Sequence, residues 1–376
     1  MFPVASRHYP GSYDELLAWF PDDDACRDYL DWLRWRDGWR CPLCVSHDGW
    51  LLANGRRECA RCGRQTSVTA GTIFHHARSP LTVWFAAAWL MTSQKYGVSA
   101  LGLQRALGLG SYQTAWAMLH RYRKAMVRPG RERLHGHVEV DETYVGGDEQ
   151  GVRGRQTETK AIVAIAVEIE HPKGFGRVRM QHISDVTKDS LIPFVTDVVE
   201  PGATVHTDGW PAYATVGQHG YEHERTVMRQ QSDPAHVVMP GVHRIASLLK
   251  RWLLGTHQGS VSPEHLDAYL NEFTFRFNRR TSRRRGLLFY RLLEQAVVTD
   301  PVIYRDLIVS PRPRGRRPTL PLRSPAPAFA AVAMARGDVP GAPDLDRDPL
   351  FAEMKTVERA AIPGRSEMGA SPAGAT

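Results

Sequence analysis

Four cysteines in two closely spaced pairs constrain the fold of this chain more than any other feature of its sequence. Two residues separate Cys41 from Cys44, two separate Cys59 from Cys62, and 14 residues lie between the pairs. Each pair can chelate one Zn²⁺ ion, and two pairs complete a tetrahedral site of four thiolates. A redox role is disfavoured, because no thioredoxin-like β-α-β pattern surrounds the pairs. The spacing predicts a structural zinc ribbon, with four unrelated buried thiols as the alternative.

Length and charge narrow the class of protein further. A chain of 376 residues is too long for one ordinary core, so we expect two or three domains. The formal net charge of +8 favours an anionic partner, nucleic acid before a membrane surface. No apolar run approaches the length of a membrane span. Cysteines in metal-binding pairs indicate a reducing compartment, which we take to be a bacterial cytoplasm.

The segment that follows the cysteines is helical and carries a candidate DNA-binding motif. Residues 12–36 and 79–127 show helical patterns, and within 99–127 a short helix, a glycine-rich turn and a longer helix follow one another. Ser99 and Ser111 are suited to cap these two helices. The layout predicts a helix-turn-helix whose second helix presents Arg121, Arg123 and Lys124 to DNA. A plain helical hairpin with a solvated basic face is an equally good interpretation.

After Gly136 the apolar period changes to two, which indicates strands. In chain order we predict three strands (HVEVDETYVGG, TKAIVAIAVEIE and FGRVRMQHISDV), a helix (KDSLIPFVTDVV), a strand (ATVHTDGW), a short helix, a strand (HERTVMRQ) and a helix containing VHRIASLLKRW. Residues 263–297 return to a helical pattern. From residue 311 onward proline, alanine, glycine and arginine dominate, which predicts a disordered tail.

Two aspartates stand out within the strand pattern. Asp141 interrupts an apolar alternation, and Asp208 lies at the carboxyl end of a later strand. Carboxylates on neighbouring strands can share divalent cations, which activate water or a hydroxyl and stabilise the leaving oxygen of a phosphodiester. Glu142 directly follows Asp141, so it points to the opposite face of the sheet. The alternative is that a strand-end aspartate such as Asp208 only caps the following turn.

The helix around residues 242–252 offers a third polar group. Its apolar stripe is formed by Val242, Ile245, Leu249 and Trp252. His243 and Lys250 are seven residues apart on another stripe, with only small side chains between them. This face leaves room for a ligand to approach both groups, although a surface histidine on an amphipathic helix is the simpler interpretation.

At this point the chain resembles the bacterial insertion-sequence transposases of the ISXO-like type, which have a DDE catalytic domain of the RNase H-like fold. The resemblance rests on the phrases RWRDGWRCPLC, VDETYVGG, HTDGW, LKRWLLGTHQG and FRFNRR. It implies that Asp141, Asp208 and His243 hold two catalytic Mg²⁺ or Mn²⁺ ions and that Lys250 contacts a phosphate. The spacings of 35 from Asp208 to His243 and of seven to Lys250 fit the family pattern. His243 replaces the usual glutamate; Glu264 and Glu272 are the next candidates for that position.

Together these features predict an α+β multidomain chain in five parts. They are an N-terminal helical segment (1–37), a zinc ribbon (38–78), a helix-turn-helix-like segment (79–130), an RNase H-like mixed α/β catalytic domain (135–300) and a disordered C-terminal tail (311–376). The residues predicted to bind DNA are Arg121, Arg123, Lys124, Lys250, Arg251, Arg276, Arg279 and Arg280.

The function predicted from the resemblance is a nucleoid-associated transposase. It would bind the terminal repeats of its own element as a homo-oligomer, cleave double-stranded DNA there and join the ends to target DNA. Two alternatives belong to other classes: a catalytically inactive DNA-binding protein derived from a transposase, and an RNase H-like nuclease without strand transfer.

Overall fold

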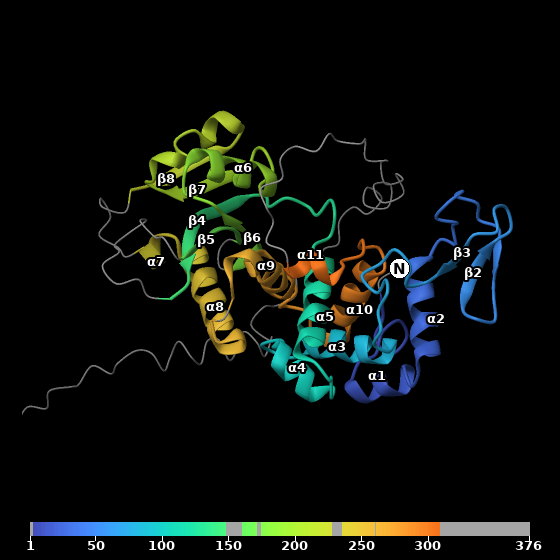
Figure 1. Ribbon diagram of the computed structural model, residues 1–376. Coiled ribbons are helices and arrows are strands. Elements are labelled where there is room, and N and C mark those ends of the chain that lie inside the picture. The colour runs from blue at the N-terminus through green and yellow to red at the C-terminus, as the bar shows by residue number, and fades with distance from the viewer. Residues whose placement is uncertain (1–2, 148–159, 171–173, 228–234, 260, 309–376) are drawn as a thin grey trace, which may run out of the picture. The chain divides into compact units, whose positions relative to one another are not determined.

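The computed structural model describes residues 3–147, 160–170, 174–227, 235–259 and 261–308, and their elements are arranged as Figure 1 shows. The predicted tail lies outside these residues. The zinc ribbon consists of three short antiparallel strands, β1 (Gly49–Leu51), β2 (Arg56–Cys59) and β3 (Gln65–Ser67), in the order β1-β2-β3. A side chain at Gly49 would place its Cβ 2.4 Å from the carbonyl oxygen of Glu58, so only glycine allows this pairing.

Eleven α-helices are found in the described part of the chain. Their bounds are α1 (Tyr13–Trp19), α2 (Asp23–Arg34), α3 (Leu81–Ser93), α4 (Ala100–Ala106), α5 (Tyr112–Ala125), α6 (Lys188–Val198), α7 (Ala235–Val238), α8 (Pro240–His257), α9 (Pro263–Phe277), α10 (Arg285–Ala296) and α11 (Tyr304–Ile308). The predicted caps are confirmed: the Ser99 and Ser111 hydroxyls accept backbone N–H groups at the starts of α4 and α5.

The helices before and after the sheet share one hydrophobic core. Buried residues of α2, α3 and α5, including Leu30, Phe85 and Leu119, pack with Phe289 and Leu293 of α10. The predicted boundary at residue 300 therefore does not follow the packing, because α10 leaves the catalytic domain and completes the N-terminal helical core. An apolar stripe requires burial but does not specify which core will bury it.

A five-stranded mixed sheet forms the centre of the catalytic domain. Its strands are β4 (His137–Val145), β5 (Ala161–Ile169), β6 (Phe175–Ile183), β7 (Thr204–Asp208) and β8 (Glu222–Thr226). They lie in the order β6-β5-β4-β7-β8; β4, β5 and β6 pair antiparallel, whereas β7 and β8 run parallel to β4. This order is the RNase H-like topology that the sequence predicted. The predicted short helix between the last two strands is replaced by two 3₁₀ turns, η1 (Pro211–Tyr213) and η2 (Val216–His219).

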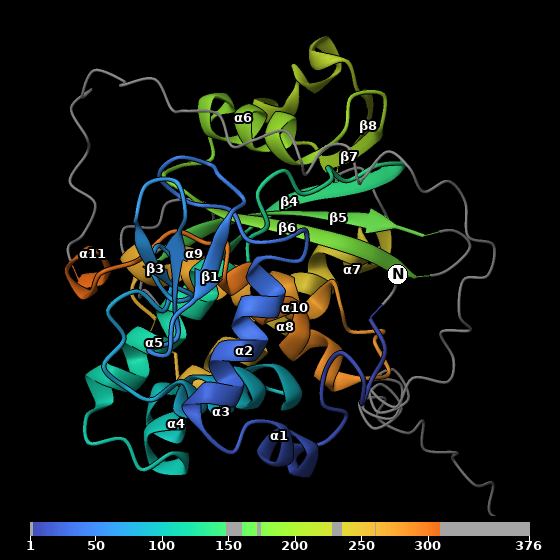
Figure 2. The same cartoon turned by 90° about the vertical axis from the view of Figure 1, so that its right-hand side faces the viewer.

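Helices cover both faces of the sheet (Figure 1). On one face, Val138 and Val140 of β4 and Val205 of β7 pack with the buried side of α6. On the other face, alternate residues of β5 pack with the predicted apolar stripe of α8 and with α9. The same layers are visible in Figure 2, with α6 above the strands and α8 and α9 below them. None of the helices in the described ranges has the length and apolar character that a membrane crossing needs.

Helix α5 meets α9 through a buried ion pair. Arg123 Nε donates to Glu272 Oε2 at 2.9 Å, and the two side chains are 1 % and 0 % exposed. The Arg123 guanidinium also lies over the ring of Tyr269, 4.0 Å from its centroid. The prediction that Arg123 contacts DNA is therefore wrong, because this charge is enclosed between two helices. The same burial removes Glu272 from the candidates for a third catalytic acid.

Candidate active site and zinc ribbon

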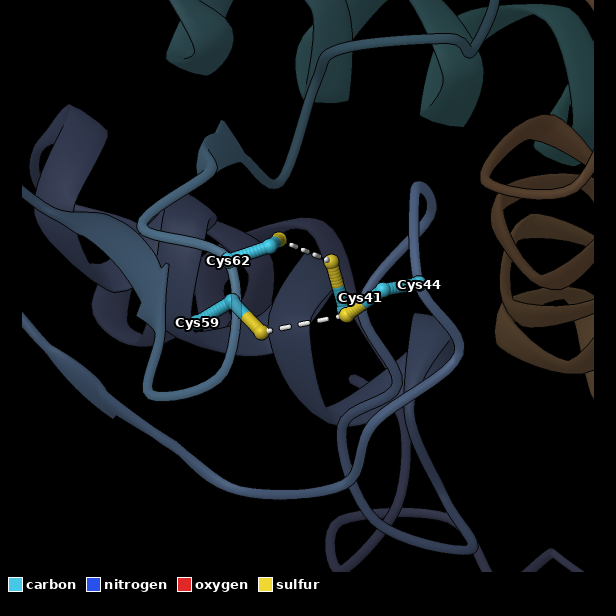
Figure 3. Close-up of side chains that lie close together, drawn as sticks. All are labelled: Cys41, Cys44, Cys59 and Cys62. Carbon is cyan, nitrogen blue, oxygen red and sulfur yellow. Dashed lines mark hydrogen bonds between the residues drawn. The ribbon is translucent and has the colours of Figure 1, made fainter.

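The four cysteines meet at one point of the ribbon. The Sγ atoms of Cys41 and Cys62 are 3.6 Å apart, those of Cys44 and Cys59 are 3.5 Å apart, and all four lie within 4.8 Å of one another. Figure 3 shows the sulfur atoms directed toward a common centre. Tetrahedral zinc with Zn–S bonds of about 2.3 Å requires sulfur separations of about 3.8 Å. The cluster fits a structural Zn²⁺ ion.

The backbone around Cys41 is shaped to hold a thiolate. Burial opposes ionisation of the Cys41 thiol, but hydrogen bonds from the backbone of Cys44 and Leu43 outweigh it and lower the pKa to about 6. The turns after the two cysteine pairs are alike. The N–H group of Val45 donates to the carbonyl oxygen of Cys41, and that of Gly63 donates to the carbonyl oxygen of Cys59. Val45 and Gly63 both have a positive φ.

Zinc should be lost together with any one of these ligands. We expect Cys62→Ala to lower the zinc content by one ion per chain and to unfold the ribbon, because structural zinc supplies about 10–16 kcal/mol of folding free energy in small zinc modules. Zinc per chain can be measured by elemental analysis. Cys26→Ala is the control, since Cys26 is fully buried in the helical core, where burial raises the pKa of its thiol to about 12. Unchanged zinc content in Cys62→Ala would contradict the assignment.

Sheet register brings the two aspartates together. β4 and β7 run parallel, and their paired residues end with Val140 beside Thr207. The next step along both strands places Asp141 beside Asp208. Alternation puts both on the face covered by α8, since Val140 and Val205 point to the α6 face. The pair therefore lies where the pairing of β4 with β7 ends, a place that we call the catalytic edge.

Tyr213 lies near three carboxylates of this part of the sheet. Its side chain is fully buried, and burial together with the charges of Glu142, Asp141 and Asp208 raises its pKa well above the ordinary value. Its hydroxyl donates to Glu142 Oε2 at 3.3 Å, so Glu142 does point away from the face that carries Asp141. Asp208 also accepts the N–H of Trp210 at 2.9 Å. Turn capping and metal binding are compatible here, because a carboxylate has about four acceptor positions.

Glu139 anchors α8 over this face. Its carboxylate is 2 % exposed, and Oε2 accepts the N–H of Val242 at 3.0 Å in the first turn of the helix. Burial raises the pKa of Glu139 to about 7, against hydrogen bonds from the Val242 and Gly241 backbone that lower it. His243 is the next residue along the helix, so this contact sets its position. The alternation of β4 could have indicated Glu139, because it lies two residues from Asp141 on the same face.

His243 and Lys250 lie in α8, half-buried and exposed respectively. Burial and the positive charge of Lys160 lower the pKa of Lys250, which places two cations near each other beside the start of β5. Among the described residues, the ligand atoms of Asp141, Asp208 and His243 do not all lie within 4.8 Å of one another. The structure thus places the two acids at the catalytic edge and His243 on α8, the helix that covers the same face of the sheet. The three side chains do not form a compact cluster.

The arginines of the C-terminal helices are bound within the protein. Arg276 donates to carbonyl oxygens at the end of α3, which would otherwise lack partners. Arg279 and Arg280 stack on Phe275 and Phe277 and donate to nearby carbonyl oxygens. These contacts explain the alternation of aromatic residues and arginines without DNA. Lys124, Lys250 and Arg251 are exposed, and Arg121 is half-buried beside Trp84.

The chain thus combines a four-cysteine ribbon with, later in the sequence, an RNase H-like sheet that carries two neighbouring acids. Comparison with known families agrees with this architecture. Residues 133–278 match the model of the ISXO2-like transposase domain, and residues 21–65 match that of the transposase zinc-ribbon domain. No curated protein sequence matches the chain significantly. The chain therefore carries the catalytic domain and the zinc-ribbon domain of ISXO2-like transposases.

Proposed function

We propose that this transposase binds the terminal inverted repeats of an insertion sequence and catalyses metal-dependent strand cleavage and strand transfer. The observation that supports this most is the register that sets Asp141 beside Asp208 within the ISXO2-like domain. Both side chains offer hard oxygen ligands at the end of a rigid sheet, which suits Mg²⁺ or Mn²⁺. When bound, such ions activate the attacking oxygen and stabilise the leaving oxygen of a phosphodiester.

The other residues of the site have separate roles in this proposal. His243, held by the Glu139 anchor of α8, completes the metal site or orients the nucleophile. Lys250 contacts a phosphate near the scissile bond, and Lys160 adds a second cation beside it. Two neighbouring ammonium groups repel each other in the free protein, and a phosphate between them would relieve that repulsion. This pairing gives a physical reason for DNA to dock beside Lys250 on α8.

DNA binding is proposed to involve both the helical segment and the catalytic domain. Gln113 and Thr114 are exposed in the first turn of α5, the part of a recognition helix that reaches base edges. Lys124 and Arg251 are exposed cations that can contact phosphates. Pairing two element ends requires at least two protomers, so the active form would be a homo-oligomer. Its substrate is chromosomal DNA, which places the activity at the bacterial nucleoid in the cytoplasm.

A cleavage assay on a labelled duplex tests the proposed function. The duplex carries the inverted repeat found beside the coding region, and a scrambled duplex is the control. We expect nicking at the repeat end with Mg²⁺ or Mn²⁺ and none with EDTA, followed by joining of a pre-nicked end to plasmid DNA. Binding without nicking would favour a catalytically inactive DNA-binding protein. Nicking without joining would favour a nuclease.

The position of His243 can be tested in the same assay. We expect His243→Ala to slow cleavage by about 10²-fold or more, the usual cost of losing a group that handles the nucleophile. Mn²⁺ should support higher activity than Mg²⁺, since it accepts nitrogen ligands more readily. Ser247→Ala is the matched control, one turn further along α8 and exposed. Full activity in His243→Ala would move the third position elsewhere, to Glu264 among the residues considered.

A further inference from the structure

Three polar side chains converge on the sheet away from the proposed catalytic edge. The ligand atoms of His137, His206 and Glu224 all lie within 4.8 Å of one another, although no cysteine or aspartate takes part. They come from three adjacent strands, β4, β7 and β8. His137 Nδ1 is 3.9 Å from Glu224 Oε2, and the two imidazole rings are 5.7 Å apart between centroids. Apart from the four cysteines, this is the one such group of three or more potential metal ligands in the described part of the chain.

Strand register explains why these residues meet. His206 pairs directly with Glu224 across β7 and β8 and with Glu139 across β7 and β4, and His137 lies two residues before Glu139, beside Thr204. All three therefore lie on the face that carries Glu139 and Asp141. His137 precedes Asp141 by four residues on one strand, about 13 Å at the usual rise of about 3.3 Å per residue. His206 precedes Asp208 by two residues, about 7 Å by the same measure. The group thus shares no ligand with the catalytic edge and lies before it on the same face of the sheet.

The surroundings prepare His206 to bind a cation. His206 is 9 % exposed, and its Nε2 is hydrogen-bonded to Thr226 Oγ1 at 2.8 Å. When the imidazole donates from Nε2 to that hydroxyl, Nδ1 is left as the basic nitrogen. Metal-binding histidines are commonly oriented by such a second partner.

We propose that His137, His206 and Glu224 form a second zinc site, distinct from the ribbon and from the catalytic edge. Two imidazoles and a carboxylate are a ligand set that zinc prefers, with a water molecule in the fourth position. Tetrahedral zinc needs ligand separations of about 3.4 Å, so the group must contract slightly. Glu224 can supply this movement, since its side chain is 52 % exposed on the edge strand. The ion would tie edge strand β8 to β7 and β4.

Zinc stoichiometry tests this site on the full chain. Every variant carries Asp141→Asn and Asp208→Asn, so that zinc bound at the catalytic edge is not counted with the zinc of the proposed site. After saturation with Zn²⁺ and dialysis, we expect two zinc ions per chain in this background and one after His137→Ala or Glu224→Gln. His135→Ala is the matched control, an exposed histidine two residues before His137, and should keep both ions.

A milder variant keeps the test informative if a ligand substitution disturbs the fold. Thr226→Val leaves all three ligands in place and should weaken zinc binding about 10- to 100-fold, as expected for loss of an orienting partner. The melting temperature of the parent background should rise with added Zn²⁺, and that of Glu224→Gln should not. One zinc per chain in the parent background, or two in a folded His137→Ala chain, would overturn the proposal. Neither result depends on cleavage activity.

Discussion

Asp141→Asn and Asp208→Asn should each lower the rate of strand cleavage by about 10³-fold or more. Each substitution replaces a charged oxygen ligand by a neutral amide of the same size, so the fold is retained while the affinity for divalent cations falls. Metal ions contribute several kcal/mol to stabilising a phosphodiester transition state, and each 1.4 kcal/mol changes the rate about tenfold. The initial rate of nicking on the repeat-bearing duplex measures the effect.

DNA binding should survive in both variants. Affinity for the duplex comes mainly from cations that neutralise phosphates, and neither aspartate supplies one. Removing a negative charge from a DNA-facing edge should leave affinity unchanged or slightly higher, as fluorescence anisotropy at fixed salt can measure. A loss of binding equal to the loss of cleavage would assign these residues to docking instead of chemistry.

Glu142→Gln provides the matched control for the two aspartates. Glu142 follows Asp141 directly but points to the opposite face, where its carboxylate accepts the Tyr213 hydroxyl. A glutamine carbonyl can accept the same hydrogen bond, so we expect less than about a tenfold change in cleavage rate. If Glu142→Gln were as inactive as Asp141→Asn, the assignment of the catalytic acid to one face of β4 would fail.

Local sequence patterns were sufficient to predict most of the catalytic fold. The alternation of Val138 and Val140 with polar residues places β4 within a few residues of its observed bounds. The predicted stripe of α8, from Val242 to Trp252, is buried as expected. These predictions hold because each depends only on which side of an element is apolar, a property carried by neighbouring residues. The Cys₄ cluster is predictable for a similar reason, since chelation by a CxxC pair is local.

Features that depend on distant partners were not predictable in the same way. Arg123 lies in a basic helix and has no local sign of burial, while Glu272 is 149 residues away. The helix α10 carries an ordinary amphipathic pattern, yet it packs in the N-terminal core. The group formed by His137, His206 and Glu224 requires the parallel order of three strands, which no short segment encodes.

Breaking the buried pair of Arg123 and Glu272 should have the largest effect on stability among the changes considered outside the zinc ribbon. Arg123→Met or Glu272→Met leaves one charge enclosed between α5 and α9 without its partner, which costs about 3–5 kcal/mol. Atoms of both side chains, Arg123 Nη2 and Glu272 Oε1, are already buried without a hydrogen-bond partner among the described residues. The loss of the ion pair would therefore leave a buried charge with no other partner nearby to replace the lost hydrogen bond. Urea denaturation followed by helix content measures the free energy of unfolding.

The double variant distinguishes a balanced ion pair from two independent contacts. Two methionines of similar length remove both charges and their desolvation cost, so Arg123→Met with Glu272→Met should lose far less than the two single changes added together. The exposed pair of Arg128 and Glu132 is the control, and Arg128→Met should cost no more than about 1 kcal/mol. Additive losses in the double variant would show that the two charges do not act as a pair. Because α5 belongs to the helical core and α9 packs on the sheet, strong coupling would also mean that this pair helps to hold the helical core against the catalytic domain.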